Sequence, residues 1–132
     1  FYEKLHLNAI KAGGEPIFQV SPSGTRNMIS FIKNGGLIAL MIDQAVKDGK
    51  YLNFLGKPAK TSISIANIAL KYDAIIIPAY GIRRDDNKIV VSFESPIKLT
   101  NSLAITSAMN SSLEARVQET PEQWYWPHRR WK

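Results

Sequence analysis

The apolar run Leu-Ile-Ala-Leu-Met-Ile at residues 37–42, which lies between Gly36 and Asp43, decides the predicted fold. A strand that is apolar at every position suits a parallel sheet that is covered on both faces. A second apolar run, rich in β-branched residues, follows at residues 74–80 after a helix predicted over residues 61–72. Strands that alternate with helices in this way predict an α/β fold with a mostly parallel sheet flanked by helices.

The remaining helices and strands are predicted from end signals and periodicity. Helices are expected over residues 3–12, from a cap at Ser21 or Ser23 to Gly35-Gly36, from a cap at Thr61 or Ser62, and from Thr100 or Asn101 to Pro121. Shorter strands are expected over residues 16–20, 51–55 and 88–93, and the last of these can be antiparallel because it follows a turn. In the last helix, Met109, Leu113 and Val117 recur at every fourth position and give it a core face.

Composition bounds the class of protein and its partners. The 132 residues suit a single domain, and the formal charge of +6 favours phosphate groups, nucleic acid or an anionic membrane face as partners. The absence of cysteine excludes disulfides, thiolate zinc sites and a Cys nucleophile. No apolar run approaches the roughly 18–20 residues that span a bilayer. The chain opens without Met inside a helix-like pattern, so we expect it to be part of a longer protein.

Asp43 and Gln44 form the first candidate site. In open parallel sheets, ligands bind beyond the carboxyl ends of the strands, and this pair directly follows the run at residues 37–42. A carboxylate there can orient a histidine, hold a cation or accept a hydrogen bond from a substrate hydroxyl. The alternative is that Asp43 only caps the following loop, and position alone does not decide between the two.

Arg26 is a second candidate, because Gly24-Thr25-Arg26 lies at a predicted helix N-terminus. Backbone N–H groups, the helix dipole and the guanidinium can together bind phosphate there, although a solvated Arg in an exposed first turn is the favoured alternative. The two histidines, His6 and His128, form no metal-binding motif, and no nucleotide-binding or hydrolase motif occurs. No metal site is therefore predicted.

The tail at residues 121–132 reads Pro-Glu-Gln-Trp-Tyr-Trp-Pro-His-Arg-Arg-Trp-Lys and contains all three tryptophans. Indole rings and Arg pairs suit a membrane interface with its phosphates. Mixed aromatic and basic side chains also bind single-stranded nucleic acid. A third interpretation is a tail that packs its aromatic rings against the sheet. Composition leaves these three interpretations open.

This tail resembles the closing signature of the bacterial lipid A biosynthesis acyltransferases, the lauroyl/myristoyl transferase family. That signature runs roughly Pro-Glu-Gln-Trp-x-Trp-x-His-Arg-Arg-(Trp/Phe)-Lys. Upstream stretches that resemble the family in order and spacing are residues 35–44, 54–61 and 77–80, with Met109-Asn110 and Leu113-Glu114. The resemblance spans roughly residues 13–132.

The resemblance implies the α/β fold of the glycerolipid acyltransferase superfamily, present here in part. It implies acyl transfer from acyl carrier protein to a hydroxyl of a lipid A precursor at the cytoplasmic face of the inner membrane, with the membrane surface as a partner and without a cofactor or nucleic acid. The family's catalytic motif is His-x-x-x-x-Asp/Glu, whose His is the general base. Here Lys11 stands at the matching position after His6. We therefore expect residues 1–132 to be the C-terminal portion of a single acyltransferase domain, with the motif upstream and the chain alone inactive.

The resemblance also implies roles for single residues. Asp43 is expected to be catalytic, because it can orient the missing histidine or the substrate. Arg129 and Arg130 are expected to hold a phosphate of the glycolipid or to order the sheet edge. The predicted substrate-binding residues are Gln44, Arg26, Thr61, Arg129 and Arg130. Three alternatives stay open: a related transferase for another membrane lipid, a basic nucleic-acid-binding module, and a non-catalytic domain that packs on a partner.

Overall fold

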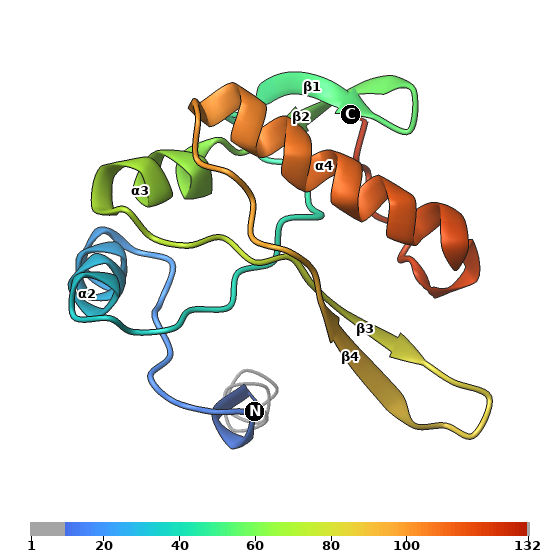
Figure 1. Ribbon diagram of the computed structural model, residues 1–132, viewed down its shortest axis with the longest axis horizontal. Coiled ribbons are helices and arrows are strands. Elements are labelled where there is room, and N and C mark those ends of the chain that lie inside the picture. The colour runs from blue at the N-terminus through green and yellow to red at the C-terminus, as the bar shows by residue number, and fades with distance from the viewer. Residues whose placement is uncertain (1–9, 132) are drawn as a thin grey trace. The chain divides into compact units, whose positions relative to one another are not determined.

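The computed structural model describes residues 10–131, and the chain divides into two compact units, residues 1–39 and residues 40–132 (Figure 1). His6 and most of the helix predicted over residues 3–12 lie outside the described residues, and residues 10–12 are helical.

The first unit contains helix α2, Pro22–Lys33. Its start agrees with the sequence prediction, because the Ser21 side chain caps it by accepting a hydrogen bond of 3.0 Å from the Gly24 N–H. Gly35, with a φ of 79°, follows the helix, in agreement with the helix end predicted at Gly35-Gly36. The strand predicted over residues 16–20 is wrong: the described part of this unit contains no strand, and Val20 is fully exposed.

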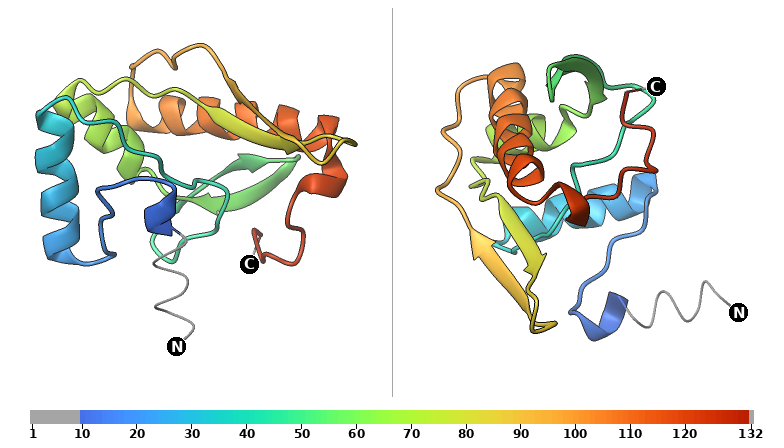
Figure 2. Two further views of the ribbon diagram at one scale, coloured as in Figure 1. Left: turned by 90° about the horizontal axis from the view of Figure 1, so that it is seen from below. Right: turned by 90° about the vertical axis from the view of Figure 1, so that its right-hand side faces the viewer.

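The second unit contains two antiparallel hairpins and two long helices. Strand β1, Lys50–Phe54, pairs with β2, Lys57–Thr61, and β3, Ala79–Arg83, pairs with β4, Ile89–Phe93. The helices are α3, Ser64–Tyr72, and α4, Ser102–Glu119, and a short 3₁₀ helix, η1, spans Pro121–Gln123. Helix α4 contacts both α3 and β1 (Figure 2). No helix among the described residues is long and apolar enough to cross a membrane.

The predicted mostly parallel sheet flanked by helices is wrong, because all strand pairs of the described residues are antiparallel. The apolar run at residues 37–42 belongs to no strand, and the run at residues 74–80 contributes only its last two residues to β3. Both runs are covered on one side only. Ile42 and Ile76 pack against the core, whereas Met41 and Ile75 are 84% and 75% exposed.

The two hairpins form because their turns need only a few residues with positive φ. Leu55 and Gly56, which join β1 to β2, have φ values of 51° and 74°, and Asn87 in the second hairpin has a φ of 63°. Such turns match the twist of the strands that they connect. A parallel pair instead needs a long crossover and a neighbouring strand, which an apolar run does not specify by itself.

Helix α4 provides the core face that its periodicity predicts. Asn101 caps it by accepting a hydrogen bond of 2.9 Å from the Ala104 N–H. Toward its N-terminal end, Met109 and Ile105 pack with Ala66 of α3. Toward its C-terminal end, the buried cluster is Leu113, Val117, Phe54 and Ala59. The helix thereby joins the β1–β2 hairpin to α3.

Candidate functional site

The C-terminal tail folds back onto the β1–β2 hairpin (Figure 1). The rings of Trp124 and Trp131 lie 5.5 Å and 5.8 Å from the ring of Phe54, and the Trp131 indole N–H donates to the Phe54 carbonyl at 3.2 Å. Trp126 packs edge-on against Trp124 but stays 48% exposed. Of the three interpretations of the tail, packing of its aromatic rings is therefore observed, although on a hairpin rather than on a parallel sheet.

Arg130 is the largest fully buried side chain of the described residues. Its Nη1 donates to the Lys60 carbonyl at 2.6 Å, and its Nη2 donates to the Thr61 hydroxyl at 2.8 Å. The guanidinium also lies 5.2 Å from the centre of the Phe54 ring. Burial lowers the pKa of Arg130, and the negative charge of Asp43 opposes this shift. The tail is thus anchored by a buried cation. The cost of burying its charge is offset mainly by hydrogen bonds to neutral oxygen atoms.

Thr61 and Asn110 complete this buried polar network. The Asn110 amide donates to the Asn53 carbonyl at 3.1 Å and lies 3.3 Å from the Thr61 hydroxyl. The Thr61 hydroxyl in turn donates to the Ala59 carbonyl at 3.1 Å. The predicted helix cap at Thr61 or Ser62 is wrong: Thr61 ends β2, and Ile63 precedes α3 without a side-chain cap.

The segment at residues 43–45 lies against this network. The Ala45 N–H donates to Nε2 of His128 at 2.8 Å. Asp43 is half-buried, and its Oδ1 is buried without a hydrogen-bond partner among the described residues. No carboxylate of the described residues lies within 4.0 Å of the Arg130 nitrogens, so Asp43 influences this cation from beyond ion-pair distance. The Asp43 carboxylate therefore has one oxygen available for a hydrogen-bond donor.

The structure thus brings together three of the predicted site residues: Asp43, Thr61 and Arg130. Gln44 adjoins them in the chain and is exposed, as is Arg129. Arg26 lies in the first turns of α2, in the other unit, and is also exposed. Among residues 10–131, no group of three or more His, Cys, Asp or Glu side chains can hold a metal ion.

Sequence reasoning missed two members of the network, His128 and Asn110. His128 stands inside the tail signature, and Asn110 follows Met109 on the core side of the last helix. A buried polar side chain needs a hydrogen-bond partner. The presence of Asn110 beside Met109 on the predicted core face was therefore a sequence signal for a buried polar contact.

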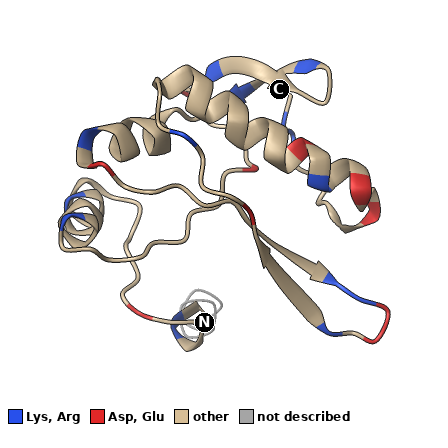
Figure 3. Cartoon of the chain, viewed as in Figure 1, with Lys and Arg blue, Asp and Glu red and all other residues tan. Residues whose placement is uncertain are grey.

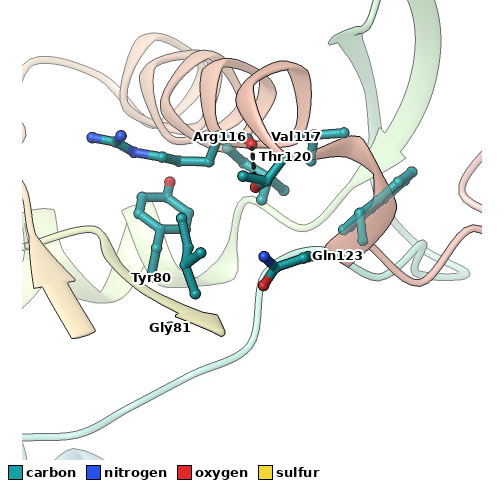
Figure 4. Close-up of a pocket in the computed structure, with 9 residues that line it drawn as sticks. Tyr80, Gly81, Arg116, Val117, Thr120 and Gln123 are labelled. Atoms are coloured by element: carbon teal, nitrogen blue, oxygen red, sulfur yellow. Dashed lines mark hydrogen bonds between the residues drawn. The ribbon is translucent and has the colours of Figure 1, made fainter. Parts of the chain in front are cut away.

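A separate hollow of about 110 Å³ lies between β3 and the end of α4 (Figure 4). It is lined by Tyr80, Gly81, Ile82, Leu113, Arg116, Val117, Thr120, Gln123 and Trp124. The Gln123 side chain accepts from the Arg83 N–H at 2.8 Å and donates to the Arg83 carbonyl at 2.9 Å, so it ties the tail to this hairpin.

The polar groups beside the hollow are bound to one another. The Tyr80 hydroxyl lies 2.6 Å from Ser112 Oγ, which donates to Glu94 at 2.6 Å, and Arg116 pairs with Glu94 at 2.8 Å. Burial raises the pKa of Tyr80. The hydrogen bond from Ser112, with further help from Arg116, lowers the pKa of Glu94. This chain of contacts stabilises the second hairpin and leaves its carboxylate paired, unlike Asp43.

Comparison with family models matches residues 17–132 to the family described as bacterial lipid A biosynthesis acyltransferase. No curated protein gives a significant match to the chain. The match begins close to where the sequence resemblance begins and includes Asp43 and the whole tail.

Proposed function

The chain belongs to the bacterial lipid A biosynthesis acyltransferase family, and from this we propose that it supplies the Asp43 side of an acyltransferase active site. The reaction is transfer of a fatty acyl chain from acyl carrier protein to a hydroxyl of a lipid A precursor. The proposed location is the cytoplasmic face of the inner membrane, where such a glycolipid acceptor is accessible.

One observation carries the role of Asp43: its Oδ1 is buried and has no partner among the described residues. An unpaired buried acceptor is costly, and a donor that binds it lowers that cost. An imidazole N–H or a substrate hydroxyl is such a donor. Asp43 then acts as a positioning residue that orients the base or holds the hydroxyl for attack.

Acyl transfer to a hydroxyl needs a general base that accepts the hydroxyl proton, and Asp43 does not take that role. The attacking hydroxyl forms the new C–O bond, the thioester C–S bond breaks, and the hydroxyl proton passes through a base to the departing thiolate. His128 uses Nε2 to accept the Ala45 N–H, and Lys11 occupies the acid position after His6. We therefore expect no acyl transfer from residues 1–132 alone.

The remaining predicted residues fall into two groups by exposure. Arg130 and Thr61 are buried and bound to protein atoms, which suits a role in positioning the tail and the segment at residues 43–45. Gln44, Arg129 and Arg26 are exposed and can contact a phosphate or sugar hydroxyl of the acceptor directly.

Two assays test the proposal. The first compares acyl transfer by the 132-residue chain with transfer by the same chain joined to an upstream segment that carries a His-x-x-x-x-Asp/Glu motif; only the joined protein should form product. The second replaces Asp43 with Asn in the joined protein. We expect kcat to fall by about 10²–10⁴-fold with a changed pH–rate profile, because the base loses its orientation.

Two results would contradict this assignment. Product formed by the 132-residue chain alone would show that it contains its own base. An Asp43→Asn variant that keeps its kcat, or that loses activity only because it unfolds, would remove Asp43 from the reaction. Unfolding curves of the variant distinguish these last two cases.

A further inference from the structure

The β1–β2 hairpin carries a cluster of lysines, Lys47, Lys50, Lys57 and Lys60, that we call the lysine hairpin. We infer that the lysine hairpin is the surface through which this unit lies on a bilayer of anionic phospholipids. The inference rests on the proposed function at a membrane and deepens it by naming the surface and the lipid class.

The lysine hairpin carries positive charge that the rest of the described chain leaves unneutralised. Between residues 47 and 61 the sequence has four lysines and one acid, Asp48. None of these lysines lies within 4.0 Å of a carboxylate in the part of the chain that the structure describes. Lys47, Lys50 and Lys57 are exposed, and Lys60 is half-exposed. Figure 3 shows basic and no acidic positions along β1 and β2.

The second hairpin, β3–β4, does not share this excess of unpaired positive charge. The second hairpin contains Arg83, Arg84 and Lys88 but also Asp85 and Asp86. Lys88 pairs with Asp86 at 3.5 Å. The two hairpins therefore have strands of equal length, but residues 47–61 have a net charge of +3 (four Lys against one Asp), whereas residues 79–93 have a net charge of only +1 (three cations against two Asp).

The outer face of the lysine hairpin combines an aromatic and a basic side chain. Phe54 and Ala59 are fully buried on the inner face, so the residues that alternate with them point outward. Lys50 and Lys57 lie at the two ends of the inner face, whereas Lys60 lies on the outer face. Tyr51 and Lys60 are directly opposite each other on that outer face, with Lys60 Nζ 5.5 Å from the centre of the Tyr51 ring. The Tyr51 side chain is 66% exposed.

The hairpin also presents its cations in a fixed geometry. The buried guanidinium of Arg130 holds the Lys60 carbonyl, and Lys60 Nζ donates to the Lys47 carbonyl at 3.3 Å. The backbone under the lysines is thus tied to the core and to the tail. A surface that is already ordered loses little conformational entropy when it binds.

These features favour a lipid surface over a folded acidic partner. Tyr prefers the headgroup level of a bilayer, and Lys can cover apolar surface with its stem while its ammonium reaches a phosphate. A protein partner is usually held by a buried apolar centre, and the outer face offers only Tyr51 and Pro58 for that purpose. Anionic lipid attracts each basic residue near its surface, with an effect of about fivefold per lysine.

The test is binding of the full 132-residue chain to phospholipid vesicles, measured by sedimentation. Vesicles of phosphatidylcholine alone are compared with vesicles that also contain phosphatidylglycerol. The variant is Lys47→Glu with Lys60→Glu, which reverses the cation of the outer face and the one beside it, and the matched control is Arg84→Glu with Lys88→Glu, which changes the net charge by the same amount. We expect the wild type to prefer the anionic vesicles, the variant to bind them at least about 25-fold more weakly, and the control to stay within about twofold.

Other outcomes overturn the inference. Equal weakening by both double substitutions would mean that total charge, and not the hairpin, drives binding. Unchanged binding by Lys47→Glu with Lys60→Glu would place the lipid surface elsewhere. If the wild type ignores anionic vesicles but binds acyl carrier protein or a single-stranded oligonucleotide through these lysines, the surface recognises a macromolecule instead. Competition by inorganic phosphate at constant ionic strength that abolishes vesicle binding would indicate a site for free phosphate.

A second variant and an independent assay separate a binding defect from a folding defect and from loss of catalysis. If charge reversal disturbs folding, Lys47→Gln with Lys60→Gln removes the cations without adding acids and should still weaken binding. Vesicle binding requires no catalysis, so it can fail while the Asp43 variant still confirms the proposed transferase role, and the reverse also holds.

Discussion

His128 Nε2 accepts the backbone N–H of Ala45 at 2.8 Å, a contact that joins positions 83 residues apart. Ala45 follows Asp43-Gln44, and His128 belongs to the aromatic and basic tail. The bond therefore connects the two parts of the sequence that most resemble the acyltransferase family. Because Arg130 anchors the same tail to β2, the position of the Asp43 carboxylate depends on how the tail is held.

The first prediction concerns this contact. His128→Ala leaves the part-buried Ala45 N–H without a partner, which costs about 1–3 kcal/mol of unfolding free energy. His128→Gln places an amide oxygen near the position of Nε2 and should recover most of that loss. Hydrogen exchange of the Ala45 amide gives a local measurement, and we expect fast exchange in the Ala variant only. Equal exchange in both variants would show that the bond does not hold the segment.

The second prediction separates the two adjacent arginines of the tail. Arg130→Met removes two charged hydrogen bonds to β2, to the Lys60 carbonyl and the Thr61 hydroxyl, so we expect a loss of at least about 3 kcal/mol in urea unfolding. Arg130→Lys should also be destabilising, because an ammonium does not reproduce the planar fork. Arg129→Ala, at an exposed position, should stay within about 0.5 kcal/mol of the wild type. A small effect at Arg130 would mean that the buried network contributes little to stability.

The helices could be predicted from sequence because their signals are local. Ser21 and Asn101 cap α2 and α4 through their own side chains, and the spacing of Met109, Leu113 and Val117 marks the buried face of α4. The parallel sheet could not be predicted correctly, because an apolar run shows that side chains are buried but not which strand pairs with it. The alternation of exposed and partly buried positions at residues 37–39 and 74–77 cannot be read from the sequence, because all of these residues are apolar.

Strand β2 was missed for a related reason. Its sequence, Lys-Pro-Ala-Lys-Thr at residues 57–61, has few apolar residues and contains Pro58, which is disfavoured in strands. Pairing with β1 across the Leu55-Gly56 turn overrides that preference. In the candidate site, Asp43 and Arg130 could be named from motifs, whereas the partners of Asn110 and His128 depend on contacts between distant segments.

The third prediction is a dependence of stability on pH that arises at Glu94. Its pKa in the folded state is lowered from an ordinary value of 4.5, first by the Ser112 hydrogen bond and then by Arg116. A lowered folded pKa stabilises the protein above that ordinary value, and the contribution is lost as the pH falls through the folded pKa. Urea unfolding of the wild type should therefore weaken below about pH 4.5. The Glu94→Gln variant should be less stable than the wild type at pH 7 and should show a shallower decline in acid. Parallel curves for the two proteins would exclude Glu94 as the source.

The last prediction uses opposite faces of β1. Phe54 is fully buried and contacts Trp124, Trp131 and the Arg130 guanidinium, so Phe54→Ala should cost about 3–5 kcal/mol and loosen the tail. Tyr51→Ala removes a ring of similar size from the exposed face and should change stability by less than about 1 kcal/mol. Tryptophan fluorescence is the second measurement, because release of Trp131 from the hairpin shifts its emission to longer wavelength before global unfolding. If Phe54→Ala lowers stability without an early shift, the tail and the hairpin unfold as one unit. The tail would then hold Asp43 through the stability of the whole core and not through its own docking.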